Sequence, residues 1–234
     1  MSSTLGTLFL IPNTLGDDSR TEQLPWVLPS ETITQTAKLT HWIVEDAKTA
    51  RAFLKAVDSV SPLACTIQEM QMSEWRGVAR NAKYGDAVKP MDLLKPLIAG
   101  KDMGLMSEAG VPGVADPGAE LVLAAHKLGA KVKPLVGPSS ILLGLMASGL
   151  NGQRFAFQGY IPHDAQDRIA RLKQLEIESR KLQQTQIWIE TPYRNIAMLM
   201  ACLNALSPQS MLCMGMDLSL PSETITTLSI ADWR

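Results

Sequence analysis

Two loops rich in small residues carry side chains that are well placed for chemistry. The first, residues 107–118, holds the carboxylates Glu108 and Asp116 among glycines and prolines, and the second, residues 136–140, holds two serines. Each loop lies between an apolar run typical of a buried strand and a segment with helical periodicity. In open α/β sheets ligands bind where strands end, and free N–H groups at a helix start bind ligand oxygens. The same composition suits ordinary turns, so it leaves both interpretations open.

Carboxylates also end two other apolar runs. Glu45 and Asp46 follow one of them, and Glu190 closes another. A carboxylate beside an acceptor hydroxyl can remove its proton, so these three residues and Asp116 are candidate catalytic bases. Asp46 and Asp116 also stand directly before expected helices, where they would serve equally well as N-caps. The sequence does not choose between the two roles.

Apolar runs alternate with helix-period segments along the chain, and this pattern predicts an α/β protein. Strands are expected at about residues 6–12, 41–45, 64–68, 103–107, 131–136, 154–162, 185–190, 211–216 and 223–229. Helices are expected at about 31–38, 47–56, 91–99, 117–128, 140–148, 165–178 and 193–203, while 18–30, with two prolines, reads as irregular. We predict two α/β domains, 1–115 and 116–234, each a mixed or mostly parallel sheet flanked by helices.

Composition excludes several classes of protein. The chain has 234 residues, 46% of them hydrophobic, and 22 basic against 23 acidic residues, so no overall charge favours nucleic acid or an anionic membrane. Three cysteines and three histidines show no metal-ligand spacing, which predicts no metal site and a reducing, cytoplasmic location. No stretch approaches the length of a membrane span. The phosphate loop of NTPases, the GxGxxG fingerprint and the GxSxG elbow are all absent.

Several segments together resemble the tetrapyrrole methylase superfamily. In chain order they are GTLFLIPNTLGD, IVEDAKTAR, MSEAGVPGVADPG, KVKPLVGPSSILLGLMASGL, RFAFQGYIP, WIETPYRN and DLSLPSETI. They follow the order of that family's motifs and extend over nearly the whole chain. Within the superfamily they are most similar to the bacterial branch that 2′-O-methylates a cytidine of small-subunit ribosomal RNA. The resemblance implies a two-domain α/β homodimer that binds S-adenosylmethionine in the cleft between its domains.

The resemblance also assigns residues to the methyl donor. One side of the donor would be lined by Ser107, Glu108, Ala109, Gly110, Val111 and Pro112, and the other by Pro138, Ser139 and Ser140. Ile189 and Met216 would contribute from the second domain. Positioning of the methyl group supplies most of the catalysis of such a transfer.

The acceptor side departs from the family pattern. EDTR of the family is EDAK here, and a family segment reading EHNE is replaced by IQEMQMSEW. We therefore keep three alternatives: a methyltransferase for a tetrapyrrole or other small molecule, a protein that binds S-adenosylmethionine without catalysis, and an unrelated enzyme whose loops bind phosphate. A group of cations between residues 154 and 181 could contact RNA or simply be a solvated helix face; it comprises Arg154, Arg168, Arg171, Lys173, Arg180 and Lys181.

Overall fold

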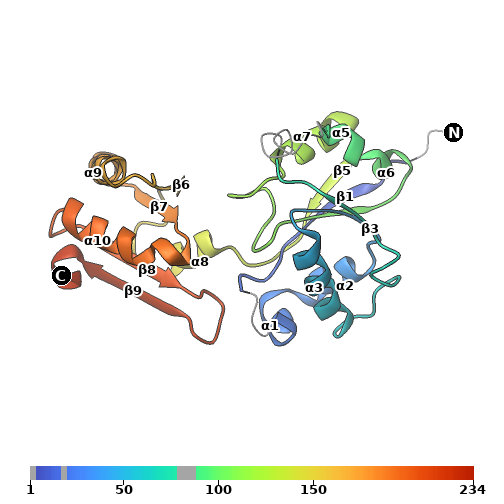
Figure 1. Ribbon diagram of the computed structural model, residues 1–234, viewed down its shortest axis with the longest axis horizontal. Coiled ribbons are helices and arrows are strands. Elements are labelled where there is room, and N and C mark those ends of the chain that lie inside the picture. Colours follow the sequence, from blue (N-terminus) through green and yellow to red (C-terminus); the bar gives the residue numbers. More distant parts are fainter. Residues whose placement is uncertain (1–3, 17–19, 78–87) are drawn as a thin grey trace. The chain divides into compact units, whose positions relative to one another are not determined.

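A parallel sheet organises the first part of the chain in the computed structural model, which describes residues 4–16, 20–77 and 88–234 (Figure 1). Its strands are β1 (Thr7–Ile11), β2 (His41–Val44), β3 (Gln71–Glu74), β4 (Met103–Met106) and β5 (Lys131–Pro134). They run in the order β3-β2-β4-β1-β5, and every pair is parallel. All five carboxyl ends therefore lie at one edge of the sheet.

Helices cover both faces of this sheet, because its central strands are apolar on both sides. One face carries α1 (Arg20–Val27), α2 (Ser30–Ala37) and α3 (Ala47–Asp58), and the other carries α5 (Pro90–Leu93), α6 (Lys95–Ile98) and α7 (Ala119–Leu128) (Figure 1). Neighbouring residues of one strand alternate between the two cores: Trp42 packs with the first group of helices and Ile43 with the second. Gly104 leaves room for the Trp42 ring, since a Cβ atom there would lie 2.5 Å from it.

The second part of the chain holds two small sheets and its own core. Its elements are α8 (Ser140–Ala147), β6 (Phe155–Tyr160), α9 (Ala165–Leu182), β7 (Thr185–Ile189), η1 (Pro192–Arg194), α10 (Asn195–Ala205), β8 (Met211–Met216), β9 (Thr224–Ser229) and α11 (Ile230–Trp233). β6 and β7 are parallel, whereas β8 and β9 form an antiparallel hairpin. Leu172 and Leu175 of α9 pack with Met198 and Cys202 of α10 and with Leu212 of β8. The predicted α/β class, with flanking helices, is confirmed.

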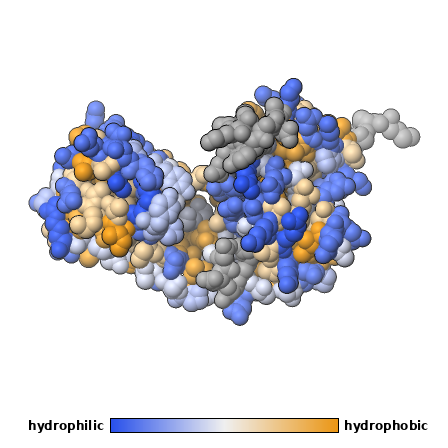
Figure 2. Space-filling model, viewed as in Figure 1, coloured by the Kyte–Doolittle hydropathy of each residue, from blue (hydrophilic) through white to orange (hydrophobic). Residues whose placement is uncertain are grey.

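The chain divides into two compact units, Met1–Ser139 and Ser140–Arg234. This division falls later than the predicted boundary at 115/116. The reason is that β5 pairs with β1 and that α7 packs its Leu121 and Ala125 into the core of the parallel sheet. On the face shown in Figure 2, each unit is mainly hydrophilic with small apolar patches.

Three predicted elements are wrong in detail. Residues 20–27 form a helix despite Pro25, because Leu24 and Leu28 bury their side chains against the sheet. The strand expected at 64–68 is absent; β3 begins at Gln71, where its N–H reaches the carbonyl of Thr40. The helix expected at 91–99 is two short helices separated at Leu94. Among the described helices, none is both long and apolar enough to cross a bilayer.

Candidate functional site

The carboxyl edge of the parallel sheet gathers most of the predicted site residues of the first unit. Asn13 follows β1, Glu45 and Asp46 follow β2, Arg76 lies just beyond β3, Ser107 and Glu108 follow β4, and the 136–140 loop follows β5. The helices that follow β1 and β2 lie on one face of the sheet and the helix that follows β4 lies on the other, so the connections reverse from one face to the other at β4. Such a reversal is where open α/β sheets bind ligands.

Asn13 fixes the first loop to the end of β1, and it is fully buried. Its Nδ2 donates to the carbonyl oxygens of Glu108 at 2.7 Å and Ser107 at 3.4 Å, while its Oδ1 accepts from the Thr14 N–H at 2.8 Å. Its backbone N–H donates to the Gly110 carbonyl at 2.8 Å. Sequence reasoning missed Asn13, although an amide side chain directly after a buried strand was an available signal.

The first loop turns through several left-handed residues. Gly110, Gly113 and Gly118 have φ values of 65°, 77° and 146°, and Ala115, which is not glycine, has 63°. The predicted N-cap at Asp116 is wrong, because α7 begins at Ala119 and Gly118 occupies the cap position. Asp116 is therefore held inside the loop and is free of a capping role.

The Asp116 carboxyl is half-buried beside Ser107 and Glu108, and the Ser107 side chain is buried. Burial is the main reason that the pKa of Asp116 is raised. The nearby Ser107 hydroxyl opposes this shift, and the nearby charge of Glu108 adds to it. A carboxylate with a raised pKa is a stronger base than an ordinary one, which suits proton removal.

We expect Asp116→Asn to stabilise the protein at neutral pH. The folded state holds the Asp116 proton to a higher pH than the unfolded chain does, so ionisation of this group lowers the free energy of unfolding as pH rises. Urea denaturation between about pH 4 and pH 7 would measure the free energy of unfolding of both proteins. The value for the variant should rise relative to that for wild type as pH rises. A difference that is independent of pH would contradict this assignment.

The second loop lies against the end of β1 and the start of α2. The Leu135 N–H donates to the Leu10 carbonyl at 3.0 Å, and the Thr32 hydroxyl donates to the Val136 carbonyl at 2.9 Å. Gly137 is required here, because a Cβ atom would lie 2.3 Å from the Pro12 ring. Pro138 is buried, whereas Ser139 and Ser140 are half-buried.

The two loops adjoin at Gly110. A side chain there would contact Leu15 and the carbonyl of Pro138. Along the first loop, Glu108 and Ala109 are exposed, Val111 is half-buried and Pro112 is buried. The structure thus brings together the residues of the first unit that the family resemblance assigned to the donor.

Asp46 is occupied by structural contacts. It is the N-cap of α3, as predicted, with the Thr49 N–H 2.8 Å from its Oδ1, and its Oδ2 lies 3.3 Å from the Arg76 guanidinium. Arg76 also donates to the Glu45 carbonyl at 3.2 Å. The hydrogen bond from the Thr49 backbone is the main reason that the pKa of Asp46 is lowered, so its carboxylate is a weak base.

Glu190, in the second unit, takes part in a buried ion pair with Arg194. Their closest atoms lie 3.1 Å apart, and the Thr191 N–H donates to Glu190 at 3.0 Å. The Arg194 guanidinium also donates to the carbonyls of Ile161 at 3.0 Å and Pro162 at 3.2 Å. Arg194 thereby joins the segments that follow the parallel strands β6 and β7, a role that the sequence did not reveal.

The other predicted residues of the second unit are more open. Ile189 is half-buried at the end of β7, and Met216 is exposed at the end of β8. Two of the six predicted cations are paired: Arg171 lies 3.6 Å from Glu178, and Arg180 lies 3.3 Å from Glu176. Within the described parts of the chain, no three His, Cys, Asp or Glu side chains are grouped to hold a metal ion.

Comparison with curated proteins finds relatives named ribosomal RNA small subunit methyltransferase I. The chain is 33% identical over 149 residues to the ribosomal RNA small subunit methyltransferase I of Vibrio cholerae serotype O1. This alignment covers 64% of this chain and 50% of that protein. The chain is 35% identical over 140 residues to the protein of the same name from Pseudomonas aeruginosa, covering 58% and 48%. The chain thus spans about half the length of the curated relatives that it matches. No family model matches the chain.

Solved structures share the fold over almost the entire chain. The methyltransferase CobJ aligns with a TM-score of 0.58 at 15% identity, covering 98% of this chain and 88% of that one. The uroporphyrin-III C-methyl transferase of Thermus thermophilus, solved as a complex with S-adenosyl homocysteine, aligns with a TM-score of 0.54 at 15% identity, covering 97% and 90%. The curated relatives confirm the resemblance to the bacterial ribosomal RNA methyltransferases, and the solved structures confirm the two-domain α/β fold that this resemblance predicts.

Proposed function

We propose that this chain is a methyltransferase that uses S-adenosylmethionine and methylates RNA of the small ribosomal subunit. The observation that carries the proposal is the meeting of the two small-residue loops, 107–118 and 136–140, at the carboxyl edge of a parallel sheet. The names of the curated relatives supply the acceptor class, and a fold neighbour that holds S-adenosyl homocysteine supplies the donor class.

The loops of the first unit fit the chemistry of the donor. S-adenosylmethionine carries an ammonium group, a carboxylate and ribose hydroxyls, which need polar partners, and an adenine, which needs apolar walls. Exposed Glu108 offers a carboxylate, Ser139 and Ser140 offer hydroxyls, and Pro112 and Pro138 offer apolar surface. The remaining contacts proposed in this unit are Ser107, Ala109, Gly110 and Val111. The donor supplies an electrophilic methyl group when it is bound.

Asp116 is the base that we favour among the four candidates. The carboxylates of Asp46 and Glu190 each already face an arginine, and the pKa of Asp46 is lowered. Asp116 instead has a raised pKa, and it lies within the loop proposed to hold the donor. In the proposed reaction its carboxylate accepts the proton of an acceptor hydroxyl, which leaves the oxygen free to take the methyl group.

Binding of S-adenosylhomocysteine tests the donor half of the proposal. At about 100 times its dissociation constant it should add about 2.7 kcal/mol to the free energy of unfolding, seen as a rise in Tm. Glu108→Ala and Ser139→Ala should each reduce that rise, while Glu31→Ala, at an exposed site on α2, should leave it unchanged. No rise for the wild-type protein would refute the donor assignment.

Transfer of a labelled methyl group tests the acceptor half. Small ribosomal subunits from cells that lack this gene should accept the label, and Asp116→Asn should slow the transfer by about 10² or more. Asp46→Asn should retain activity, because asparagine also caps helices. Label found only in small molecules would favour a tetrapyrrole-type acceptor, and binding of donor without any transfer would favour a non-catalytic role.

Assembly as a homodimer, in the cytoplasm where ribosomal subunits reside, completes the proposal. A stripe of apolar side chains on η1 and α10 supports it: Tyr193, Ile196 and Met200 are 79%, 78% and 52% exposed. Such a patch is typical of a surface that another chain covers. Sedimentation equilibrium should therefore give twice the mass of the chain, and Ile196→Glu should lower it to that of a monomer.

A further inference from the structure

Three cations lie in a row along the solvent side of α3. Lys48, Arg51 and Lys55 are all exposed, whereas Phe53 and Leu54 of the same helix are fully buried. Because the cations are three and four residues apart, they share one face of the helix and extend over about 10 Å. We call these three residues the α3 cation row.

Local structure does not account for the α3 cation row. No ion pair joins its three side chains to any residue in the parts of the chain that the structure describes. Like charges four residues apart, such as Arg51 and Lys55, destabilise a helix. Lys48 lies in the first turn of α3, where the helix dipole favours acidic residues and the sequence has none. Only Lys55, in the last turn, is favourably placed for the dipole. An anionic partner would offset the repulsion within the row.

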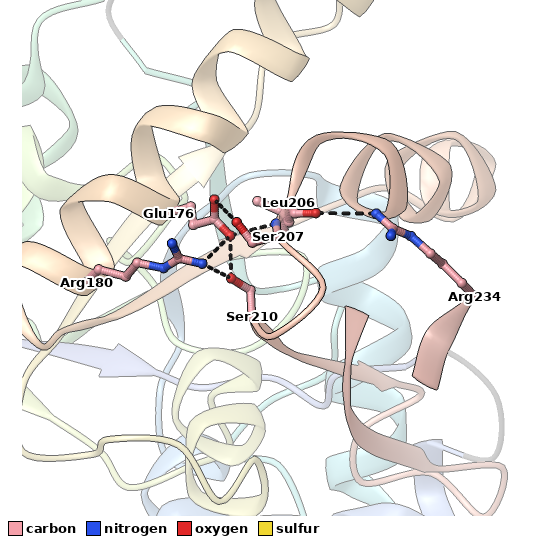
Figure 3. A network of polar contacts seen from close by, with 6 residues as sticks. All are labelled: Glu176, Arg180, Leu206, Ser207, Ser210 and Arg234. Atoms are coloured by element: carbon pink, nitrogen blue, oxygen red, sulfur yellow. Dashed lines mark hydrogen bonds and ion pairs between the residues drawn. The ribbon is translucent and has the colours of Figure 1, made fainter. Parts of the chain in front are cut away.

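Several cations elsewhere in the described chain do have partners. Figure 3 shows Arg180 of α9 paired with Glu176 at 3.3 Å. Arg76, just beyond β3, lies 3.3 Å from Asp46 and 3.7 Å from Glu74, the two carboxylates at the start of α3. Both carboxylates also accept hydrogen bonds from backbone N–H groups of the first turn of α3. They are therefore directed to Arg76 and to the backbone, and not to the α3 cation row.

An exposed tryptophan lies on the neighbouring helix. Trp26 of α1 is 80% exposed, and α1 packs against α3 in the layer that covers one face of the sheet (Figure 1). Leu28, two residues after Trp26, lies beside Gly137 at the carboxyl edge of the sheet. Lys48 lies at the same edge, because α3 begins directly after the end of β2. Trp26 and the start of the α3 cation row are therefore both close to the edge that holds the candidate site.

We propose that α1 and α3 bind a single-stranded segment of the RNA acceptor, with its phosphates on the α3 cation row and one base stacked on Trp26. This inference rests on the proposed function, which supplies RNA as the acceptor class. Cations that follow the backbone and aromatic rings that stack on unpaired bases are the two features common to surfaces that bind single strands. A duplex would keep its base faces away from Trp26, and an acidic polypeptide has no base to stack. Since the whole chain has a net charge of −1, this local positive charge is what attracts the RNA.

The salt dependence of RNA binding tests the phosphate contacts. The probe is a fluorescein-labelled single-stranded RNA of mixed sequence and about 16 nucleotides, titrated by fluorescence anisotropy between about 50 and 200 mM salt. Each phosphate contact contributes about 0.7 to the slope of log K against log salt concentration. The triple variant Lys48→Gln/Arg51→Gln/Lys55→Gln should therefore reduce the magnitude of that slope by about 2 and weaken binding at least tenfold.

The matched control removes three cations from the opposite edge of the same sheet. Lys101, Lys127 and Lys131 are exposed and lie where β4 and β5 begin. Their combined replacement by glutamine changes the net charge by the same amount and should leave the slope unchanged. All of these variants should keep the rise in Tm that S-adenosylhomocysteine gives, because none of the substituted residues is a proposed donor contact.

Substitution of Trp26 tests the stacked base. Trp26→Leu should weaken binding of the same RNA about tenfold, because stacking of one base on an aromatic ring contributes that much or more. The slope should stay at its wild-type value, since no charge is removed. Trp26→Phe keeps an aromatic ring and should retain most of the affinity.

Three results would overturn the proposal: an equal fall in slope for the two triple variants, wild-type affinity in Trp26→Leu, or competition by polyglutamate that matches competition by unlabelled RNA. The last result would indicate an acidic polypeptide as the partner. Methyl transfer measured with the same proteins separates this inference from the proposed function. RNA binding with the expected slopes but no transfer by the wild-type protein would refute the methyltransferase and support the RNA surface.

Discussion

Replacing Arg194 with methionine is expected to lower the free energy of unfolding of the second unit by about 3 to 5 kcal/mol. The substitution keeps most of the side-chain volume but leaves the Glu190 carboxylate buried without its cation. It also removes the donor to the carbonyls of Ile161 and Pro162. For a unit of this size, each kcal/mol corresponds to a fall in Tm of about 4–8 °C.

The reciprocal change provides the control. Glu190→Gln should cost less, because the Arg194 guanidinium retains both carbonyl acceptors and can still bond to the amide oxygen that replaces the carboxylate. Hydrogen exchange of the α10 amides would report on this unit alone. Equal losses of unfolding free energy for the two variants would show that the hydrogen bonds from Arg194 to the carbonyls of Ile161 and Pro162 contribute little to stability. The link that these bonds make between the segments after β6 and β7 would then contribute little as well.

Gly137→Ala is expected to have the second large effect, on both stability and donor binding. The new methyl group would lie 2.3 Å from the Pro12 ring and 3.0 Å from Leu28, so the loop or the end of β1 must move. Overpacking of this kind costs about 1–3 kcal/mol. Displacement of Pro138 and Ser139 should also weaken S-adenosylhomocysteine binding by about tenfold, equivalent to about 1.4 kcal/mol.

A double variant at positions 12 and 137 separates the effect of the steric clash from the effect of losing the flexibility of glycine. Pro12→Gly combined with Gly137→Ala removes the opposing ring, so the double variant should be more stable than the sum of the single changes predicts. Gly152→Ala, at a glycine with open space around it, should have little effect. Calorimetry would measure stability in this double-mutant cycle, and titration with S-adenosylhomocysteine would measure binding. If the losses of the single variants simply add in the double variant, contact with the Pro12 ring is not their cause.

Much of the fold was predictable because its strands are buried and its helices have clear ends. The apolar runs around Leu8, Ile43 and Leu105 gave strands in the expected places, and Gly129 ended α7 as expected. β3 escaped prediction because its sequence QMSE is polar, as an edge strand allows. α1 was not predicted because Pro25 disfavours a helix in local sequence, whereas Leu24 packs into the core that α1 shares with α3 and the sheet.

The candidate site was predictable where its residues follow strands and not where they act through tertiary contacts. The strand–loop–helix pattern predicted the two loops that contain Ser107, Glu108 and Ser139. The assignment of these residues to the methyl donor comes from the family resemblance and stays a prediction. Nothing in local sequence shows that Asn13 reaches a loop 95 residues away, or that Arg194 reaches the carbonyls after β6. The capping error at Asp116 has a similar origin, since the turn through Gly118 postpones the helix.

The order of strands in the first unit also has a consequence for synthesis of the protein. β1 is made first, yet its two neighbours are β4 and β5, with Leu8 beside Met103 and Thr7 beside Lys131. On a ribosome that adds about 5–20 residues per second, the apolar segment around Phe9 waits on the order of 10 s for its partners. Unpaired apolar strands are prone to aggregation, so we expect nascent chains of this protein to bind chaperones until residue 134 has left the exit tunnel.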